Sequence, residues 1–154
     1  MYRPKENQQR LPGNREEPRA QEGRKSAGQS VLVVDDDPIS RSIVRDQLGA
    51  RGFEVEACGS PLTALDMIRH QHYDLLILDI FLPHRDGRSL HTSVLTVNPE
   101  LARRTIFISH WEPAGTMAEY IGEHGLFLKK PFSAEDLMRG IQMATGGKPD
   151  DLSG

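Results

Sequence analysis

Residues 31–38 read Val-Leu-Val-Val-Asp-Asp-Asp-Pro, four apolar residues followed by three acids and a proline. A run of apolar residues that ends in acids is typical of a short strand buried on both faces, which is how strands lie in parallel sheets. Asp37 and Pro38 then form the expected N-cap and first residue of a helix. A buried strand that leads directly into a helix indicates an α/β unit.

The same unit is repeated along the chain. Apolar strands are predicted at 53–58, 75–78, 105–109 and 126–128, and segments with apolar residues at helical spacing follow residues 37, 60, 87, 112 and 133. Strands that alternate with helices predict a parallel sheet with helices on both faces. In such sheets ligands bind beyond the carboxyl ends of the strands, where the strand order reverses.

Composition limits the possible classes of protein. The chain has 154 residues, 37% hydrophobic and 27% charged, which suits one domain with a real core. No apolar run approaches the roughly 20 residues that cross a bilayer, and the N-terminus has no apolar leader. Cys58 is the single cysteine of the sequence, so an intrachain disulfide is excluded. We therefore expect a cytoplasmic protein without a membrane segment.

The charges divide the chain into parts. Residues 1–30 carry seven basic and four acidic residues, whereas the rest carries twelve basic and eighteen acidic ones. We predict a disordered tail over 1–29, one domain over 30–146 and a frayed tail over 147–154. An acidic domain is not expected to bind nucleic acid itself. A basic arm that contacts a membrane or nucleic acid is the alternative interpretation of the first segment, but its acidic residues favour a solvated leader.

Polar residues gather where the predicted strands end. Asp35 and Asp36 follow the first strand, Asp79 follows the third, Ser109 ends the fourth and Lys130 follows the fifth. Each alone is an ordinary turn, cap or loop residue. Together they describe a site, because crowded carboxylates repel one another and a divalent cation relieves that repulsion. Oxygen ligands suit Mg²⁺, and a lysine with a hydroxyl suits the oxygens of a phosphoryl group.

The sequence resembles the response-regulator receiver domains of two-component signalling. The resemblance covers residues 31–145 and rests on four segments in order: 31–38, Leu-Leu-Ile-Leu-Asp-Ile-Phe-Leu-Pro-His-Arg-Asp-Gly at 75–87, Ile-Phe-Ile-Ser at 106–109 and Lys-Lys-Pro-Phe at 129–132. It implies a flavodoxin-like, doubly wound (βα)5 sandwich whose five parallel strands have the order 2-1-3-4-5.

The resemblance also implies roles for the acidic residues. Asp79 would accept a phosphoryl group from a histidine kinase or a phosphotransfer protein. Mg²⁺ would be held by Asp35, Asp36, Asp79 and the backbone carbonyl of Phe81.

The resemblance also implies roles for residues in and after the fourth and fifth strands. Lys130, and not Lys129, would pair with the phosphoryl oxygens, and the Lys130–Pro131 peptide bond would be cis. Ser109 and Phe127 would form the switch, although a satisfied buried serine and a plain core phenylalanine are the ordinary interpretations of these two residues.

One pair of residues departs from the family pattern. The residue after the switch hydroxyl is usually small, and here it is His110, followed by Trp111. With Phe81, these rings could slow the attack of water on the phosphorylated aspartate. The alternative is that they point into solvent and only fill a loop.

The implied function is a stand-alone, phosphorylation-dependent switch that signals by partner binding or phosphorelay. It would catalyse only its own phosphorylation and dephosphorylation, as a monomer or weak dimer with an unknown output protein. A phosphorylation-independent interaction module on the same fold is the alternative, and it predicts a lost acceptor or a broken acidic pair. A magnesium-dependent hydrolase would need a second carboxylate near Asp79, and position 81 is Phe.

Overall fold

The computed structural model describes residues 29–82 and 86–146. Nearly all of the predicted N-terminal tail, the whole predicted C-terminal tail over 147–154 and His84 lie outside the described residues. The division of the chain at residues 29 and 146 stays a prediction.

The described chain forms one five-stranded parallel sheet, and its order β2-β1-β3-β4-β5 confirms the expected one. The strands are β1 (Ser30–Val34), β2 (Glu54–Cys58), β3 (Leu75–Asp79), β4 (Thr105–Ser109) and β5 (Leu126–Lys129). All residues of β3 and β4 are buried, as the continuous apolar runs predicted.

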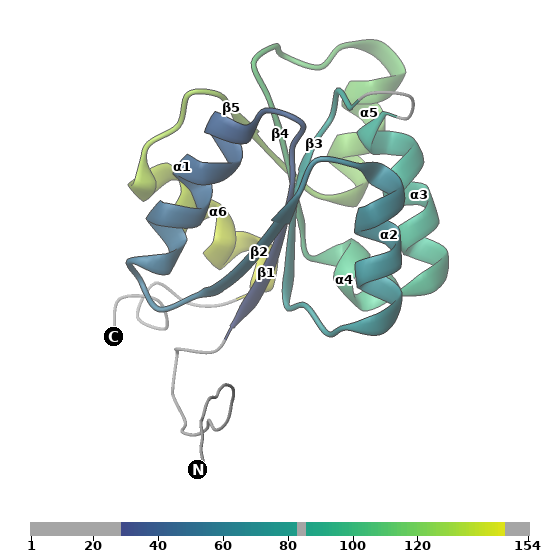
Figure 1. Cartoon of the computed structure of the whole chain (residues 1–154). Coiled ribbons are helices and arrows are strands. Elements are labelled where there is room, and N and C mark those ends of the chain that lie inside the picture. The colour runs from purple at the N-terminus through teal and green to yellow at the C-terminus, as the bar shows by residue number, and fades with distance from the viewer. Residues whose placement is uncertain (1–28, 83–85, 147–154) are drawn as a thin grey trace.

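Helices cover both faces of this sheet (Figure 1). One face carries α1 (Pro38–Gly49) and α6 (Ala134–Thr145), and the other carries α2 (Pro61–His70), α3 (Gly87–Val97), α4 (Pro99–Arg103) and α5 (Gly115–His124). The expectation of five helices was wrong by one, because a separate α4 follows α3. Asn98 begins this short helix, and its side chain accepts a hydrogen bond from the Leu101 amide.

Side-chain caps mark the starts of three helices, and the cap predicted at Asp37 forms as expected. Asp37 accepts a hydrogen bond from the Ile39 amide and Ser60 from the Thr63 amide, and a proline follows each as the first helical residue. Ser133 and Asp136 form a reciprocal capping box at the start of α6. These bonds satisfy amides that a helix start leaves without partners, so each helix begins at a fixed residue after its strand.

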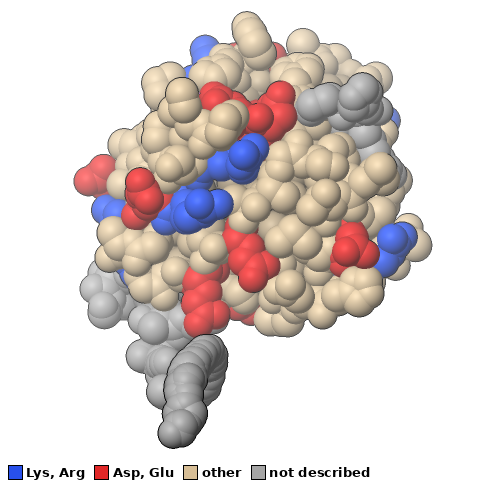
Figure 2. Space-filling view, in the orientation of Figure 1, with Lys and Arg blue, Asp and Glu red and all other residues tan. Residues whose placement is uncertain are grey.

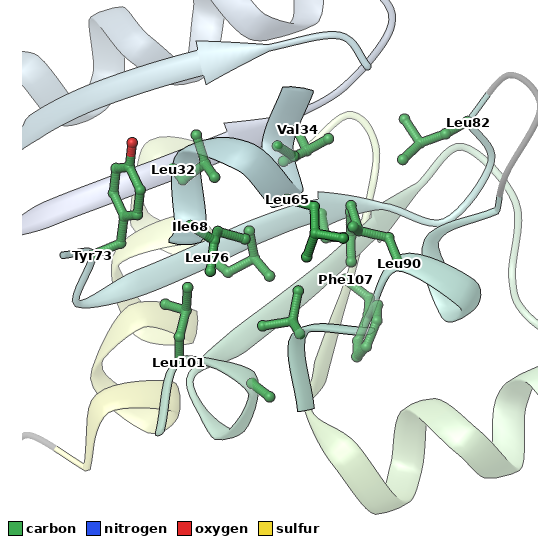
Figure 3. Packing of buried hydrophobic residues seen from close by; sticks show 14 of the residues in the cluster. Leu32, Val34, Leu65, Ile68, Tyr73, Leu76, Leu82, Leu90, Leu101 and Phe107 are labelled. Carbon is green, nitrogen blue, oxygen red and sulfur yellow. The ribbon is translucent and has the colours of Figure 1, made fainter. Parts of the chain in front are cut away.

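The core consists of two apolar layers, one on each face of the sheet. Figure 3 shows the layer under α2, α3 and α4, in which Leu65 and Ile68 of α2 meet Leu76 of β3, and Leu90 of α3 meets Phe107 of β4. The opposite layer joins alternate residues of the same strands to α1 and α6. The alternation arises because successive side chains of a strand point to opposite faces.

Strand register brings the predicted site residues to one edge. Val34 pairs with Leu78, so the residues that follow them, Asp35 and Asp79, leave the sheet side by side. Where β4 pairs with β5, Ser109 lies opposite Lys129, and Lys130 is the next residue of the chain. The carboxyl ends of β1, β3, β4 and β5 therefore present their polar residues to the same space.

Among the described residues, no helix combines the length and apolarity needed to cross a bilayer. On the face shown in Figure 2, the basic side chains drawn in colour are interleaved with acidic ones and form no continuous basic surface. The expected location in the cytoplasm stays a prediction.

Gly87 allows α3 to begin against the end of β3. A Cβ at this position would lie 2.5 Å from the carbonyl oxygen of Asp79 and 2.9 Å from the Cα of Ile80. We predict that Gly87→Ala lowers the free energy of unfolding by about 1–3 kcal/mol in urea titrations, since backbone atoms must move. Gly122→Ala is the control: a Cβ there meets nothing within 4 Å, and stability should rise by about 0.5–1 kcal/mol. Equal urea midpoints for Gly87→Ala and the wild type would contradict this account.

Candidate functional site

Three carboxylates meet at the carboxyl edge of the sheet. One oxygen from each of Asp35, Asp36 and Asp79 lies within 4.8 Å of the others. Asp35 is 0% exposed and Asp79 6%, whereas Asp36 is exposed to solvent. The cluster therefore has two buried members and one member at its mouth.

Lys130 is the cation that partly neutralises the two buried carboxylates. Its Nζ donates hydrogen bonds to Oδ2 of Asp35 at 2.7 Å and to Oδ2 of Asp79 at 2.9 Å. The ammonium is itself buried, with 7% of the residue exposed. Burial opposes its charge, but the carboxylates outweigh this effect and hold the pKa of Lys130 above its ordinary value. One buried positive charge faces two negative ones.

The two buried carboxyl groups titrate differently. Burial opposes the charge of Asp35, but hydrogen bonds from Lys130 and the Asp37 amide outweigh it, so its pKa lies below the ordinary value. Burial raises the pKa of Asp79 above its ordinary value, and the charge of Asp35 acts in the same direction. Lys130 and the Phe81 amide oppose this rise without cancelling it. The pKa of Asp79 is therefore raised mainly by burial, and repulsion from Asp35 adds to this effect.

Backbone amides fix the orientation of both side chains. The Asp37 amide donates to Oδ1 of Asp35 at 3.0 Å, and the Phe81 amide donates to Oδ1 of Asp79 at 2.9 Å. Each loop after a strand thus folds back onto the aspartate that ends that strand. Phe81 accordingly lies beside Asp79, and the role of its carbonyl as a metal ligand stays a prediction.

This donor set fits a hard divalent cation. The three clustered side chains offer only carboxylate oxygens, and Asp36 at the mouth leaves room for water ligands, as Mg²⁺ prefers. Lys130 leaves one negative charge of the buried pair uncompensated. A cation at the mouth would therefore lower the electrostatic free energy of the site.

The remaining predicted residues frame the cluster. Ser109 is 1% exposed, and its Oγ accepts a hydrogen bond from the Trp111 amide at 3.0 Å. Phe127 is half-buried and packs against the core layer that contains Phe107. The Lys130–Pro131 peptide bond is cis, as expected. The switch roles of Ser109 and Phe127 stay predictions.

Aromatic rings stand around the mouth of the site. Phe81 and Trp111 meet edge to face with ring centroids 5.9 Å apart, and they are 50% and 65% exposed. His110, also exposed, contacts Trp111 and lines an apolar groove of about 230 Å³ that reaches Lys130. The rings therefore face solvent, as the simpler expectation held, and also touch one another beside Asp79.

Sequence reasoning missed Arg41. Its guanidinium on α1 donates a hydrogen bond to the backbone carbonyl of Asp35 at 2.7 Å. A Cβ at Gly59 would lie 2.7 Å from this Nη1 atom, so the glycine leaves the space in which the guanidinium sits. The spacing from Asp35 to Arg41 is visible in the sequence, but the bond depends on how the loop between them folds.

A family model described as the response regulator receiver domain matches residues 31–142. Among curated proteins, the chain is 36% identical over 72 residues to the sensor protein EvgS of Escherichia coli K12, covering 47% of this chain and 6% of that protein. It is 31% identical over 126 residues to the response regulator MprA of Mycobacterium bovis BCG, covering 80% of this chain and 54% of that protein. The chain thus spans a small part of EvgS and about half of MprA.

Solved structures show the same architecture. The receiver domain of a sensor histidine kinase from Pseudomonas aeruginosa PAO1, described with a magnesium ion coordinated in its active site cleft, is 26% identical with a TM-score of 0.69. The alignment covers 79% of this chain and 100% of that one. The chemotaxis protein CheY4 of Vibrio cholerae is 25% identical with a TM-score of 0.69, and 77% of this chain and 99% of that one are covered.

Replacement of Lys130 tests the charge balance of the cluster. We predict that Lys130→Met, without added metal ion, lowers the free energy of unfolding by about 3 kcal/mol at pH 7, because two buried carboxylates lose their partner. The exposed neighbour Lys129 gives the control. The free energy of unfolding of Lys129→Met should stay within about 0.5 kcal/mol of the wild-type value.

The pH dependence of this effect has a definite sign. Asp35 has a lowered pKa in the folded state, so its pairing stabilises the wild type above the ordinary value of 3.8 and is lost as the pH falls through the lowered value. The deficit of Lys130→Met should therefore shrink on acidification, as its carboxylates become protonated. Urea titrations between neutral and acid pH measure both effects, and a deficit that grows on acidification would contradict the assignment.

Proposed function

Because this chain belongs to the response regulator receiver domain family, we propose that it is a phosphorylation-dependent switch whose acceptor is Asp79. The observation that carries the proposal is the pair of hydrogen bonds from Lys130 to Asp35 and Asp79. They bring an acceptor carboxylate, an acidic cation site and a buried ammonium to one point of the sheet. Phosphoryl transfer needs positioning and charge neutralisation more than covalent assistance, and this arrangement supplies both.

The proposed reaction begins at a carboxylate oxygen of Asp79. This oxygen attacks the phosphorus of a phosphohistidine, a new P–O bond forms, the P–N bond breaks, and the imidazole nitrogen keeps the bonding electron pair and takes up a proton from water. Asp35 and Asp36 would hold Mg²⁺, which when bound neutralises charge on the phosphoryl oxygens. Lys130, already 2.9 Å from Asp79, would donate to a phosphoryl oxygen.

The response to phosphorylation would pass through Ser109. Its Oγ now accepts a bond from the Trp111 amide, and its hydroxyl proton can turn toward a new acceptor. A phosphoryl oxygen on Asp79 would be such an acceptor, and Phe127 would then repack in the space that the movement leaves. The site itself would be a two-state element biased by a local change of charge.

The proposed phosphodonor is a histidine kinase or a phosphotransfer protein. Matches to stretches of EvgS, a sensor protein, and of RcsC, a sensor histidine kinase, both of Escherichia coli K12, support this class of donor. The apolar groove beside Lys130, with exposed Ile39 and Ile43 on α1 at its rim, offers a donor protein a surface next to the acceptor.

Mass spectrometry of the intact protein tests the acceptor. After incubation with acetyl phosphate and Mg²⁺, we expect the wild type to gain one phosphoryl group and Asp79→Asn to gain none. Asp46→Asn, an exposed acid on α1, is the control and should react like the wild type. Chelation of Mg²⁺ and Asp36→Asn should each slow the reaction strongly. A wild type that stays unmodified with phosphoramidate as well would favour the phosphorylation-independent interaction module.

The lifetime of the phosphorylated state tests the aromatic rings at the mouth. We predict that Trp111→Ala and His110→Ala each shorten it, because less apolar surface would stand between water and the acyl phosphate. Trp111→Phe, which keeps a ring against Phe81, should change it least. The loss of phosphate is followed over time after the donor is removed, and equal lifetimes in all four proteins would show that the rings only fill a loop.

A further inference from the structure

A buried histidine lies in the core and is not part of the acidic cluster. His91 of α3 is 0% exposed and belongs to the buried face of that helix together with Leu90 and Val94. Its ring packs against Phe107 of β4, with ring centroids 5.0 Å apart. An aliphatic residue would fill the same position by the apolar pattern of the helix, so the polar ring calls for a specific explanation.

Both nitrogens of the His91 ring have partners. Nε2 lies 2.8 Å from the carbonyl oxygen of Ala102 in α4, and Nδ1 lies 2.8 Å from the hydroxyl oxygen of Tyr120 in α5. A carbonyl oxygen can only accept, so Nε2 carries the proton and Nδ1 accepts from the Tyr120 hydroxyl. One ring thereby joins three helices.

The ring stays uncharged in this arrangement. Burial holds the pKa of His91 below its ordinary value, and the nearby His124 ring acts in the same direction. Tyr120 stacks on His124 with ring centroids 4.1 Å apart, and the Arg88 guanidinium lies over the Tyr120 ring, 5.1 Å from its centroid. Neither hydrogen-bond partner of His91 among the described residues is a carboxylate, so protonation would bury an uncompensated charge.

Helix α5 buries few of its residues and has no side-chain cap at its start. All of its residues are described, and of these Ile121 alone is buried. Its N-cap residue, Ala114, makes no side-chain capping bond, and Gly115 begins the helix at a φ of 60°. By contrast, α6 has a capping box and three buried residues. The bond from the Tyr120 hydroxyl to His91 is therefore one of the contacts that hold α5, together with bonds from α3 to Thr116 and Tyr120 and the packing of Met117 on the core.

The same helix is connected to the switch. Residues 110–114 join Ser109 to α5, and the Trp111 amide in this loop donates to the Ser109 hydroxyl. A movement of Ser109 toward a phosphoryl group would release this bond and displace the loop. The loop moves more easily when the helix at its far end is free to follow.

We propose that the hydrogen bonds of His91 to Tyr120 and Ala102 form a latch that fixes α5 against α3 and α4 in the resting protein, and that release of this latch favours the phosphorylated arrangement. The second half rests on the proposed function. A bond present in the resting state and weakened in the other must oppose the transition by its own free energy. The latch thus sets how readily phosphorylation moves α5.

Hydrogen exchange of the resting full chain, followed by mass spectrometry, tests the first half. Tyr120→Phe removes only the hydroxyl and should speed exchange in α5 about two- to tenfold, the factor that corresponds to the net contribution of one hydrogen bond, about 0.5–1.5 kcal/mol. Tyr73→Phe is the matched control, since its hydroxyl bonds to Glu56 and Gln71 at the β2 edge and should leave α5 unchanged. In a His91→Leu protein, Tyr120→Phe should have a clearly smaller effect, because the only remaining bond of the hydroxyl among the described residues is the one to Thr92 at 3.2 Å. Unchanged α5 exchange in Tyr120→Phe overturns the latch.

Binding of beryllium fluoride, a phosphoryl analogue, tests the second half. The fluorescence of Trp111, the single tryptophan of the chain, reports binding beside Asp79. We expect Tyr120→Phe to bind the analogue two- to tenfold more tightly, by about the factor seen in exchange. Faster exchange with unchanged affinity overturns the coupling to the switch. A wild type that does not bind the analogue overturns the proposed function, while the exchange result still decides the latch.

Discussion

Two buried carboxylates that share one ammonium are the constraint on which this molecule depends. Without Lys130, the charged forms of Asp35 and Asp79 would cost more free energy, and without the two carboxylates the charged form of Lys130 would cost more as well. The ammonium lies 95 residues from Asp35 in the sequence, so the bond is made only when the whole sheet is assembled. The two carboxylates and one ammonium leave a net negative charge. A bound cation would therefore lower the electrostatic free energy of the site.

Strand order determines which residues can take part. β1 and β3 are neighbours, so the two aspartates that follow them need no long reach. Lys130 follows β5, which is separated from β3 by β4, and a long flexible side chain spans that distance. The strand between them contributes Ser109 at its end, in the gap across which the lysine reaches. A parallel sheet with this strand order therefore places the carboxylates, the hydroxyl and the ammonium next to one another along one edge.

Much of this arrangement could be predicted from local patterns. Apolar runs marked the five strands within about two residues, and Asp37, Ser60 and Ser133 marked helix starts, because capping depends on residues close in sequence. The same rule applied to Asn98-Pro99 would have revealed α4, whose brevity hid it. The bonds of Arg41 and His91 could not be predicted. Tyr120 lies 29 residues after His91, and only the packing of two helices on the sheet brings them together.

The two buried polar clusters differ in a way that separates a binding site from a structural one. At His91 every nitrogen has a partner within the protein, so the group needs no ligand and its effect is to hold helices in one position. At Asp79 burial raises the pKa and Lys130 is shared with Asp35, so the group is held in an electrostatically unfavourable state. In the proposed function, a phosphoryl group and its cation would relieve that state at the acidic cluster. They would alter α5 only if the loop from Ser109 transmitted more free energy than the His91 bonds supply. The polar group in the core would therefore oppose the movement that the acidic cluster favours.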